Sequence, residues 1–194
     1  MNNKLILASS SPRRKMLLEN IGIEFEIIVP ECEEEKIKNE SPEEYVLKNS
    51  CIKALSVSGH LSDRQFALSA DTVVVKDGNV LGKPENEADA KRMLNMLSRS
   101  AHEVVTGFVI INSEGQPLHT EAVTTLVAVK VLDDREIEGY IKTGEPMDKA
   151  GAYGIQGIGS FMIERIEGSY TNVVGLPVSQ VVYTLNKLNI IKLF

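Results

Sequence analysis

Hydroxyl and guanidinium groups stand together near the start of the chain, in the run SSSPRRK at residues 9–15. The apolar run before it predicts a strand and the proline predicts a first helical turn, so Ser9 and Ser11 would lie at a helix N-terminus. Backbone N–H groups there attract anions, and the guanidinium groups of Arg13 and Arg14 suit phosphate oxygens. Ordinary helix capping with two solvated arginines is the alternative. Basic charge in a first turn opposes the helix dipole, which favours a bound anion.

Two groups of carboxylates offer a metal site or a general base. Asp71 interrupts the apolar run SADTVV, and a carboxylate buried in a strand needs a partner or a metal. It would be a metal ligand or a general base, unless it faces water at a strand edge. Glu33 or Glu34, in the run ECEEE, would join Asp71 around Mg²⁺ or Mn²⁺, because hard oxygen atoms are the metal ligands that this sequence offers. A solvated acidic loop is the simpler explanation of that run.

Two lysines and three histidines are the remaining ionisable candidates. Lys53 lies in a predicted helix, and Lys83 follows a predicted hairpin in the run GKP. Each alone is most simply a surface lysine, but together with the arginines they would neutralise a polyphosphate. His60, His102 and His119 are scattered without the spacing of metal ligands, so we expect ordinary surface or packing roles.

A glycine-rich run, GEPMDKAGAYGIQGIGS at residues 144–160, has neither helical nor strand periodicity. Its glycines allow positive φ and a close approach of the backbone to a ligand. The amide of Gln156 carries a donor and an acceptor, which matches the edge of a uracil or thymine. Asp148 and Lys149 would brace the loop by pairing. A connector under no ligand constraint is the alternative.

Other familiar chemistry is absent from the sequence. No GxxxxGK[ST] run predicts a P-loop, and GIQGIG has the glycine spacing of a dinucleotide site reversed. Neither a GxSxG elbow nor a Cys–His signature supports acyl transfer. The net charge of −6, from 21 basic and 27 acidic residues, argues against nucleic acid as a partner.

The elements that must position these groups alternate along the chain. The pattern predicts strands over 4–9, 25–30, 66–76 with a short return strand up to 84, two within 103–132, and one over 159–170; it predicts helices over 9–22, 41–59, 86–98, 133–144 and 176–190. Capping boxes (Ser41 with Glu44, Asp133 with Glu136) mark two helix starts. Leu47, Cys51 and Leu55 would form the buried face of the second helix, and a hairpin turn is expected at Asp77–Gly78.

These elements predict an α/β fold in which a long, mixed, twisted sheet is flanked by helices. Its 194 residues, 43% hydrophobic and 25% charged, suit one domain over 1–194 or two small lobes. Two cysteines without CxxC spacing indicate a reducing compartment. No run suits a signal peptide or a membrane span, so we expect a cytoplasmic location and no membrane partner.

Six short runs together resemble one family, the Maf-like nucleoside triphosphate pyrophosphatases. They are LASSSPRR, SADTVV, GKP, HEVVTG, GEPMDKAGAYGIQG and GSYTNVVGLP, which occur in the family's order and cover almost the whole chain. The resemblance implies a two-lobed Maf/Ham1-like fold with a central cleft. It also implies a hydrolase of nucleotide metabolism that converts a nucleoside triphosphate to the monophosphate and pyrophosphate with a divalent cation, Mg²⁺ or Mn²⁺.

The resemblance further implies roles for particular residues. Asp71 would be the proton acceptor, and the specificity positions would be Arg13, Thr72 and Gln156, a combination similar to the dTTP/UTP branch. Glu33, Lys53 and Lys83 would also line the catalytic site.

Other functions stay open. A 7-methyl-GTP pyrophosphatase, a house-cleaning enzyme for modified nucleotides and a non-enzymatic nucleotide-binding regulator of cell division are the alternatives, and a homodimer is also open.

Overall fold

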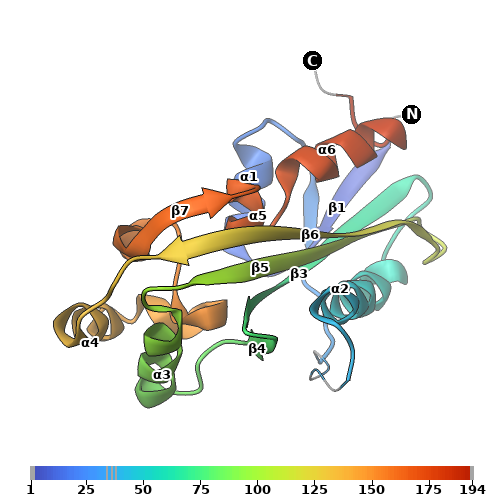
Figure 1. The fold of residues 1–194 in the computed structure, drawn as a ribbon. Coiled ribbons are helices and arrows are strands. Elements are labelled where there is room, and N and C mark those ends of the chain that lie inside the picture. The colour runs from blue at the N-terminus through green and yellow to red at the C-terminus, as the bar shows by residue number, and fades with distance from the viewer. Residues whose placement is uncertain (1–2, 34, 36, 38, 193–194) are drawn as a thin grey trace. The chain divides into compact units, whose positions relative to one another are not determined.

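The structure is a computed structural model that describes residues 3–33, 35, 37 and 39–192. Figure 1 shows its elements, which in chain order are β1 (Lys4–Ala8), α1 (Pro12–Glu19), β2 (Glu26–Ile28), α2 (Pro42–Ser58), β3 (Gln65–Lys76), β4 (Asn79–Leu81), α3 (Glu87–Leu97), β5 (Ala101–Ile111), β6 (Pro117–Val129), α4 (Asp134–Lys142), three 3₁₀ turns η1 (Glu145–Asp148), η2 (Ala150–Ala152) and η3 (Gly157–Met162), β7 (Ile163–Glu167), α5 (Tyr170–Val174) and α6 (Val178–Lys187). No helix in this described part is long and apolar enough to cross a membrane.

The strands form one seven-stranded mixed sheet, in the order β2-β1-β3-β5-β6-β7 with β4 paired to β3. Strand β1 runs parallel to both β2 and β3, whereas β4 and β7 pair antiparallel with β3 and β6. A two-residue turn joins the antiparallel strands β3 and β4, whereas α4 and the three 3₁₀ turns lie between the antiparallel strands β6 and β7. The predicted α/β class with a mixed sheet flanked by helices is therefore confirmed.

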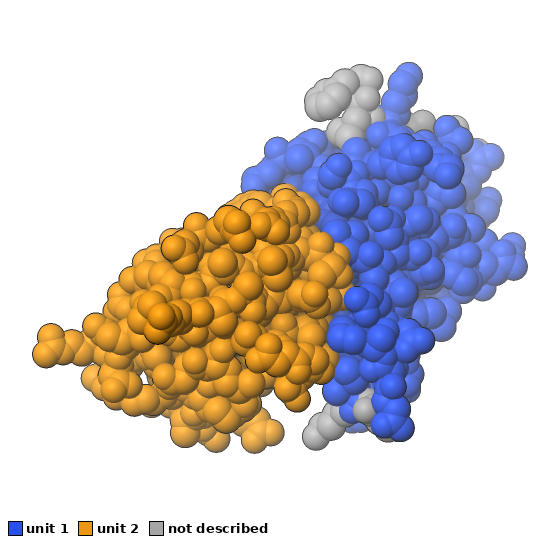
Figure 2. Space-filling view, viewed as in Figure 1, with its two compact units in different colours: residues 1–71, 106–123, 175–194 blue, residues 72–105, 124–174 orange. Residues whose placement is uncertain are grey.

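The contacts of the chain divide it into two compact units, coloured separately in Figure 2. Unit 1 comprises residues 1–71, 106–123 and 175–194, and unit 2 comprises residues 72–105 and 124–174. Strands β3, β5 and β6 each contribute residues to both units. The single domain expected over 1–194 and the central cleft stay predictions.

Unit 1 is a layer of strands between helices, with α2 on one face and α1 and α6 on the other (Figure 1). The α2 face meets β1, β3 and β5 in a buried cluster that includes Ala54, Val57, Ile6 and Val109. The predicted buried face of α2 is partly wrong: Cys51 packs against this cluster and Leu47 is half-buried, but Leu55 is 46% exposed. The helix is rotated relative to that expectation: its buried positions are Val46, Asn49, Ser50, Ala54 and Val57. Val46 lies close to Gly107, where a Cβ would lie 2.8 Å from the Val46 backbone.

Unit 2 has its own core, formed where α3 and α4 pack against the strand ends and the glycine-rich run. Its buried side chains include Leu94 and Leu97 of α3, Ile137 and Tyr140 of α4, and Tyr153 of the run. Burial of these apolar surfaces is the main stabilising term for such a unit. The glycine-rich run is therefore part of the core of this unit rather than a loose connector.

The structure confirms the helix starts and the hairpin turn that short sequence motifs predicted. Both predicted capping boxes are present, at Ser41 with Glu44 and at Asp133 with Glu136. Asp77 and Gly78 turn between β3 and β4 with φ of 50° and 77°, the positive values that a two-residue hairpin requires. The strand predicted over 159–170 is partly wrong, because residues up to Met162 form η3, and the short helix α5 was not expected.

Candidate functional site

Unit 1 contains a buried ion pair. Lys53 Nζ donates to Asp71 Oδ1 at 2.6 Å, and the two side chains are only 12% and 10% exposed. The fourth turn of α2 carries the lysine, and the middle of β3 carries the aspartate. The sequence indicated that Asp71 needs a partner or a metal, and Lys53 is that partner. A carboxylate held by one cation on a strand is a rigid place for a proton acceptor or a metal ligand.

The predicted helix start forms at α1, with Pro12 in its first turn and Ser11 as the N-cap. The hydroxyls there are used within the loop: Ser11 accepts from the Arg14 backbone N–H at 3.5 Å, and Ser9 accepts from the Ser11 backbone N–H at 3.1 Å. Arg14 donates through Nε to the carbonyl of Gly175 at 2.8 Å and through one terminal nitrogen to Ser9 at 3.4 Å. Arg14 therefore links the start of α1 to the segment before α6. Arg13 follows Pro12 in the same turn and is half-buried.

The acidic run after β2 offers carboxylates but no assembled metal cluster. Glu33 is exposed, and Glu34 lies outside the described residues. Among the described residues, no group of three or more His, Cys, Asp or Glu side chains is arranged to hold a metal. Glu35 is taken up by a salt bridge with Lys48 at 2.5 Å. Glu33 with Asp71 remains the carboxylate pair that the sequence predicts.

Unit 2 carries the other three predicted residues. Thr72 follows Asp71 on β3 and is half-buried. Lys83 is exposed in the bend after β4. Gln156 is half-buried, has extended backbone (φ −95°, ψ 156°), and its side-chain amide has no hydrogen-bond partner among the described residues. An amide left open in this way can bind a ligand that presents one donor and one acceptor.

The glycines around Gln156 serve the packing of the run itself. A Cβ on Gly159 would lie 2.4 Å from the Gly154 carbonyl oxygen and 2.6 Å from the Tyr140 hydroxyl. Gly157 has φ of 73°, and its Cβ would lie 2.9 Å from a Glu145 carboxylate oxygen. Positive φ is confirmed at some of these positions, but the close contacts are internal. Approach of this backbone to a ligand stays a prediction.

Glu145 is the residue of this run that the sequence analysis missed. Asp148 and Lys149 do pair, at 2.6 Å, as predicted. However, Lys149 also donates to the Glu145 carbonyl at 2.7 Å, and the Glu145 carboxylate binds the backbone of the run at Ile158 and Gly159. The only signal in the sequence was an acidic residue beside glycines, which is too common to indicate such a role.

A buried histidine contacts the middle of the same run. His102 Nε2 lies 2.7 Å from the Tyr153 hydroxyl, and the two rings meet edge-on. Burial, together with the positive charge of Lys76, lowers the pKa of His102 to about 4. The imidazole is therefore neutral at pH 7 and packs in the core, as expected for an ordinary histidine.

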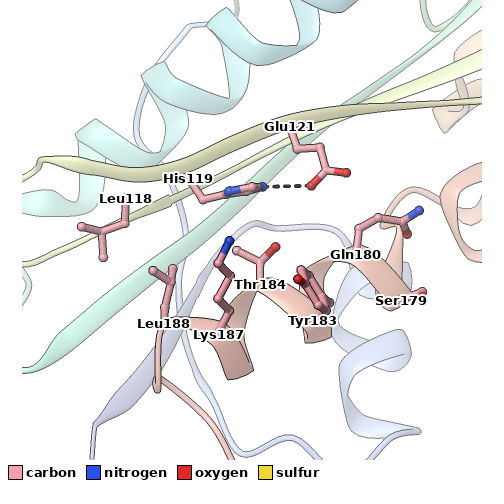
Figure 3. Close-up of a pocket in the computed structure, with 9 residues that line it drawn as sticks. All are labelled: Leu118, His119, Glu121, Ser179, Gln180, Tyr183, Thr184, Lys187 and Leu188. Atoms are coloured by element: carbon pink, nitrogen blue, oxygen red, sulfur yellow. Dashed lines mark hydrogen bonds and ion pairs between the residues drawn. The ribbon is translucent and has the colours of Figure 1, made fainter.

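Unit 1 also has a hollow of about 420 Å³ between β6 and α6, shown in Figure 3. Nine residues line it: Leu118, His119, Glu121, Ser179, Gln180, Tyr183, Thr184, Lys187 and Leu188. His119 Nε2 and Glu121, both on β6, pair at 2.9 Å within this lining. None of the predicted site residues belongs to this lining.

The fold is a mixed α/β architecture similar to that of a HAM1 protein from Coxiella burnetii. That structure matches with a TM-score of 0.57 and 15% identity, over 95% of this chain and 99% of the other. At this identity the match shows the fold alone.

Sequence comparison identifies the family. The Maf-like protein family matches residues 4–188, and this chain belongs to it. Proteins named dTTP/UTP pyrophosphatase from Geotalea uraniireducens, Citrifermentans bemidjiense and Vibrio cholerae are 48%, 50% and 49% identical to it. The alignments cover 98%, 95% and 95% of this chain and 97%, 95% and 98% of those relatives.

Proposed function

We propose that this protein hydrolyses dTTP and UTP to the nucleoside monophosphate and pyrophosphate. Support comes from relatives of that name that are 48–50% identical over nearly the whole chain. Within the structure, the observation that carries the proposal is the buried pair of Lys53 and Asp71 at 2.6 Å. It supplies a fixed carboxylate and a cation, which anhydride hydrolysis needs.

Asp71 is the proton acceptor of the proposed reaction. A water molecule loses a proton to the carboxylate as its oxygen forms a bond to an anhydride phosphorus, and the bridging P–O bond breaks to release pyrophosphate. Lys53 keeps the carboxylate in one orientation by the hydrogen bond to Oδ1. Oδ2 has no hydrogen-bond partner among the described residues, which leaves it for water or a metal.

Asp71 and Glu33 are the proposed ligands of a divalent cation. Carboxylate oxygens are the donors that Mg²⁺ and Mn²⁺ prefer, and the open Oδ2 of Asp71 fits that requirement. When bound, the ion would supply positive charge beside the phosphate oxygens and the leaving pyrophosphate.

The remaining residues bind the substrate in this proposal. The start of α1, with Ser9, Ser11, Arg13 and Arg14, attracts the phosphates through its N–H groups and guanidinium charge. Lys83 adds a further cation. Thr72 and Gln156 read the pyrimidine, for which the open amide of Gln156 is suited.

The test is a substrate panel of dTTP, UTP, CTP, GTP and 7-methyl-GTP, with Mg²⁺, with Mn²⁺ and with a chelator. Pyrophosphate and monophosphate release are both measured. We expect metal-dependent release from dTTP and UTP in equal amounts of the two products. Turnover confined to 7-methyl-GTP or CTP would overturn the specificity, and tight nucleotide binding without any turnover would favour a regulator instead.

A further inference from the structure

The two flanks of Gln156 are tied to one pair of side chains, Tyr140 and Glu145. On the N-terminal side, the backbone N–H of Gly154 donates to the Tyr140 hydroxyl at 3.1 Å. On the C-terminal side, the backbone N–H groups of residues 158–159 donate to the Glu145 carboxylate at 3.0 and 2.9 Å. The Tyr140 hydroxyl donates in turn to Glu145 at 2.9 Å, so both flanks meet at one hydrogen-bonded pair, the Tyr140–Glu145 clamp.

The clamp depends on a charged carboxylate. Burial alone would raise the pKa of Glu145, but hydrogen bonds from Gly159, Ile158 and Tyr140, with the charge of Lys149, outweigh burial and hold the pKa below its ordinary value. Oε1 accepts from Tyr140 and Gly159, and Oε2 accepts from Ile158. An amide at this position would turn one acceptor into an NH₂ donor, which would face a backbone N–H in either orientation.

The clamp is anchored in the core of unit 2. Tyr140 is 2% exposed in the last turns of α4, and its ring meets Phe161 edge-on with centroids 6.1 Å apart. Glu145 follows the Gly144 turn that ends this helix. The helix therefore sets where the clamp lies, and the clamp sets the path of the run.

Gln156 has no side-chain bond of its own among the described residues to fix its direction. Its position follows from its backbone, which enters η3 between the bound N–H groups of Gly154 and Ile158. Small shifts of a side chain that reads a ligand edge change binding of one ligand against another, because a misplaced amide leaves its partner unpaired.

We propose that Tyr140 and Glu145 are positioning residues that determine which nucleobase the enzyme prefers, by holding Gln156 in place. The proposal rests on the proposed pyrophosphatase function and on Gln156 as its base reader. Neither side chain needs to touch the substrate.

The test is Glu145→Gln, which keeps size and shape but loses one acceptor. We expect the preference for dTTP over CTP and GTP, as a ratio of kcat/KM, to fall by about tenfold or more. The change should come from a higher KM for dTTP, with kcat within about threefold of the parent enzyme. Glu138→Gln is the matched control, because it makes the same Glu-to-Gln change at an exposed residue of α4 that pairs with Lys91. It should leave the nucleotide preference unchanged.

Tyr140→Phe is a milder second variant, because it removes one hydroxyl and keeps the buried ring. We expect a smaller loss of preference in the same direction. Amide hydrogen exchange at Ile158 and Gly159, measured without nucleotide, should accelerate in both variants. Unchanged exchange, or an equal loss of kcat/KM for every nucleotide, would overturn the proposal. A parent enzyme without pyrophosphatase activity would instead overturn the proposed function, while the exchange result would still report on the clamp.

Discussion

The two units hold their candidate residues in different ways. In unit 1, Lys53 projects from α2 and Asp71 from β3, so two regular elements set their contact. In unit 2, Gln156 lies in a run whose backbone is held on both sides by the Tyr140–Glu145 clamp. The first arrangement is a contact between two charged side chains, and the second is a set of hydrogen bonds that fixes the backbone on both sides of Gln156. Changes in the first should therefore slow every nucleotide alike, whereas changes in the second should alter the preference among nucleotides.

Asp71→Asn is the change with the largest expected effect. It removes the charge that Lys53 pairs with and the proton acceptor of the proposed reaction. We expect kcat/KM to fall by about 10³-fold or more for all nucleotides, which corresponds to about 4 kcal/mol in the barrier. Steady-state assays of pyrophosphate release across the nucleotide panel measure both the size of the loss and its uniformity.

Asp77→Asn is the control for that variant. Asp77 is exposed in the turn after β3, where its φ of 50° suits asparagine equally well. Turnover should stay at the parent level. Near-normal activity of Asp71→Asn would remove Asp71 from the chemistry, and a loss limited to some nucleotides would break the contrast between the units.

The part of the structure that could be predicted is the part with local signals. Capping boxes at Ser41 and Asp133, and the turn at Asp77–Gly78, depend on hydrogen bonds and φ values within four residues. The need of Asp71 for a partner could also be predicted, because burial of a lone carboxylate in an apolar strand is unfavourable. Features of this kind are determined by residues that are close together in the sequence.

What escaped prediction depends on contacts between distant residues. The buried face of α2 includes Val46, which lies so close to Gly107 that a Cβ there would be 2.8 Å away. The role of Glu145 depends on backbone N–H groups more than ten residues away. The partners of Glu145 have no signature in the sequence, since a backbone donor carries no residue type.

The free energy of unfolding should depend on pH through His102, a buried residue of unit 2. Burial lowers the pKa of His102 to about 4 from 6.5, and its Nδ1 is buried without a hydrogen-bond partner in the described structure. As pH falls from 6.5 to 4, the unfolded chain takes up the proton first, so stability decreases through this range. The full difference is about 3 kcal/mol, at about 1.4 kcal/mol per pKa unit.

His102→Gln removes that titration and should flatten the fall in stability between pH 6.5 and 4. Urea unfolding at several pH values gives the slope for parent and variant. The exposed His60, in the turn after α2, provides the control His60→Gln, which should retain the parent slope. If His102→Gln kept the parent slope, other groups would account for the acid sensitivity.

Two glycine-to-alanine changes test the smallest effect, with opposite expected signs. Gly159→Ala would place a Cβ 2.4 Å from the Gly154 carbonyl oxygen, a backbone atom that cannot move aside cheaply. We expect a loss of about 1–3 kcal/mol in the free energy of unfolding, with faster amide exchange in the run around Gln156.

Gly139→Ala, within α4, meets no atom within 4 Å, so the same added methyl group should stabilise the protein by about 0.5–1 kcal/mol. Chemical unfolding of both variants gives the sign of each effect. Nucleotide preference then separates packing from function: Gly159→Ala should shift it through Gln156, and Gly139→Ala should not. Equal stability of the two variants would mean that the backbone of the run shifts to accommodate the new methyl group. The run would then not be rigidly fixed, and the proposed difference between unit 2 and the ion pair of unit 1 would be wrong.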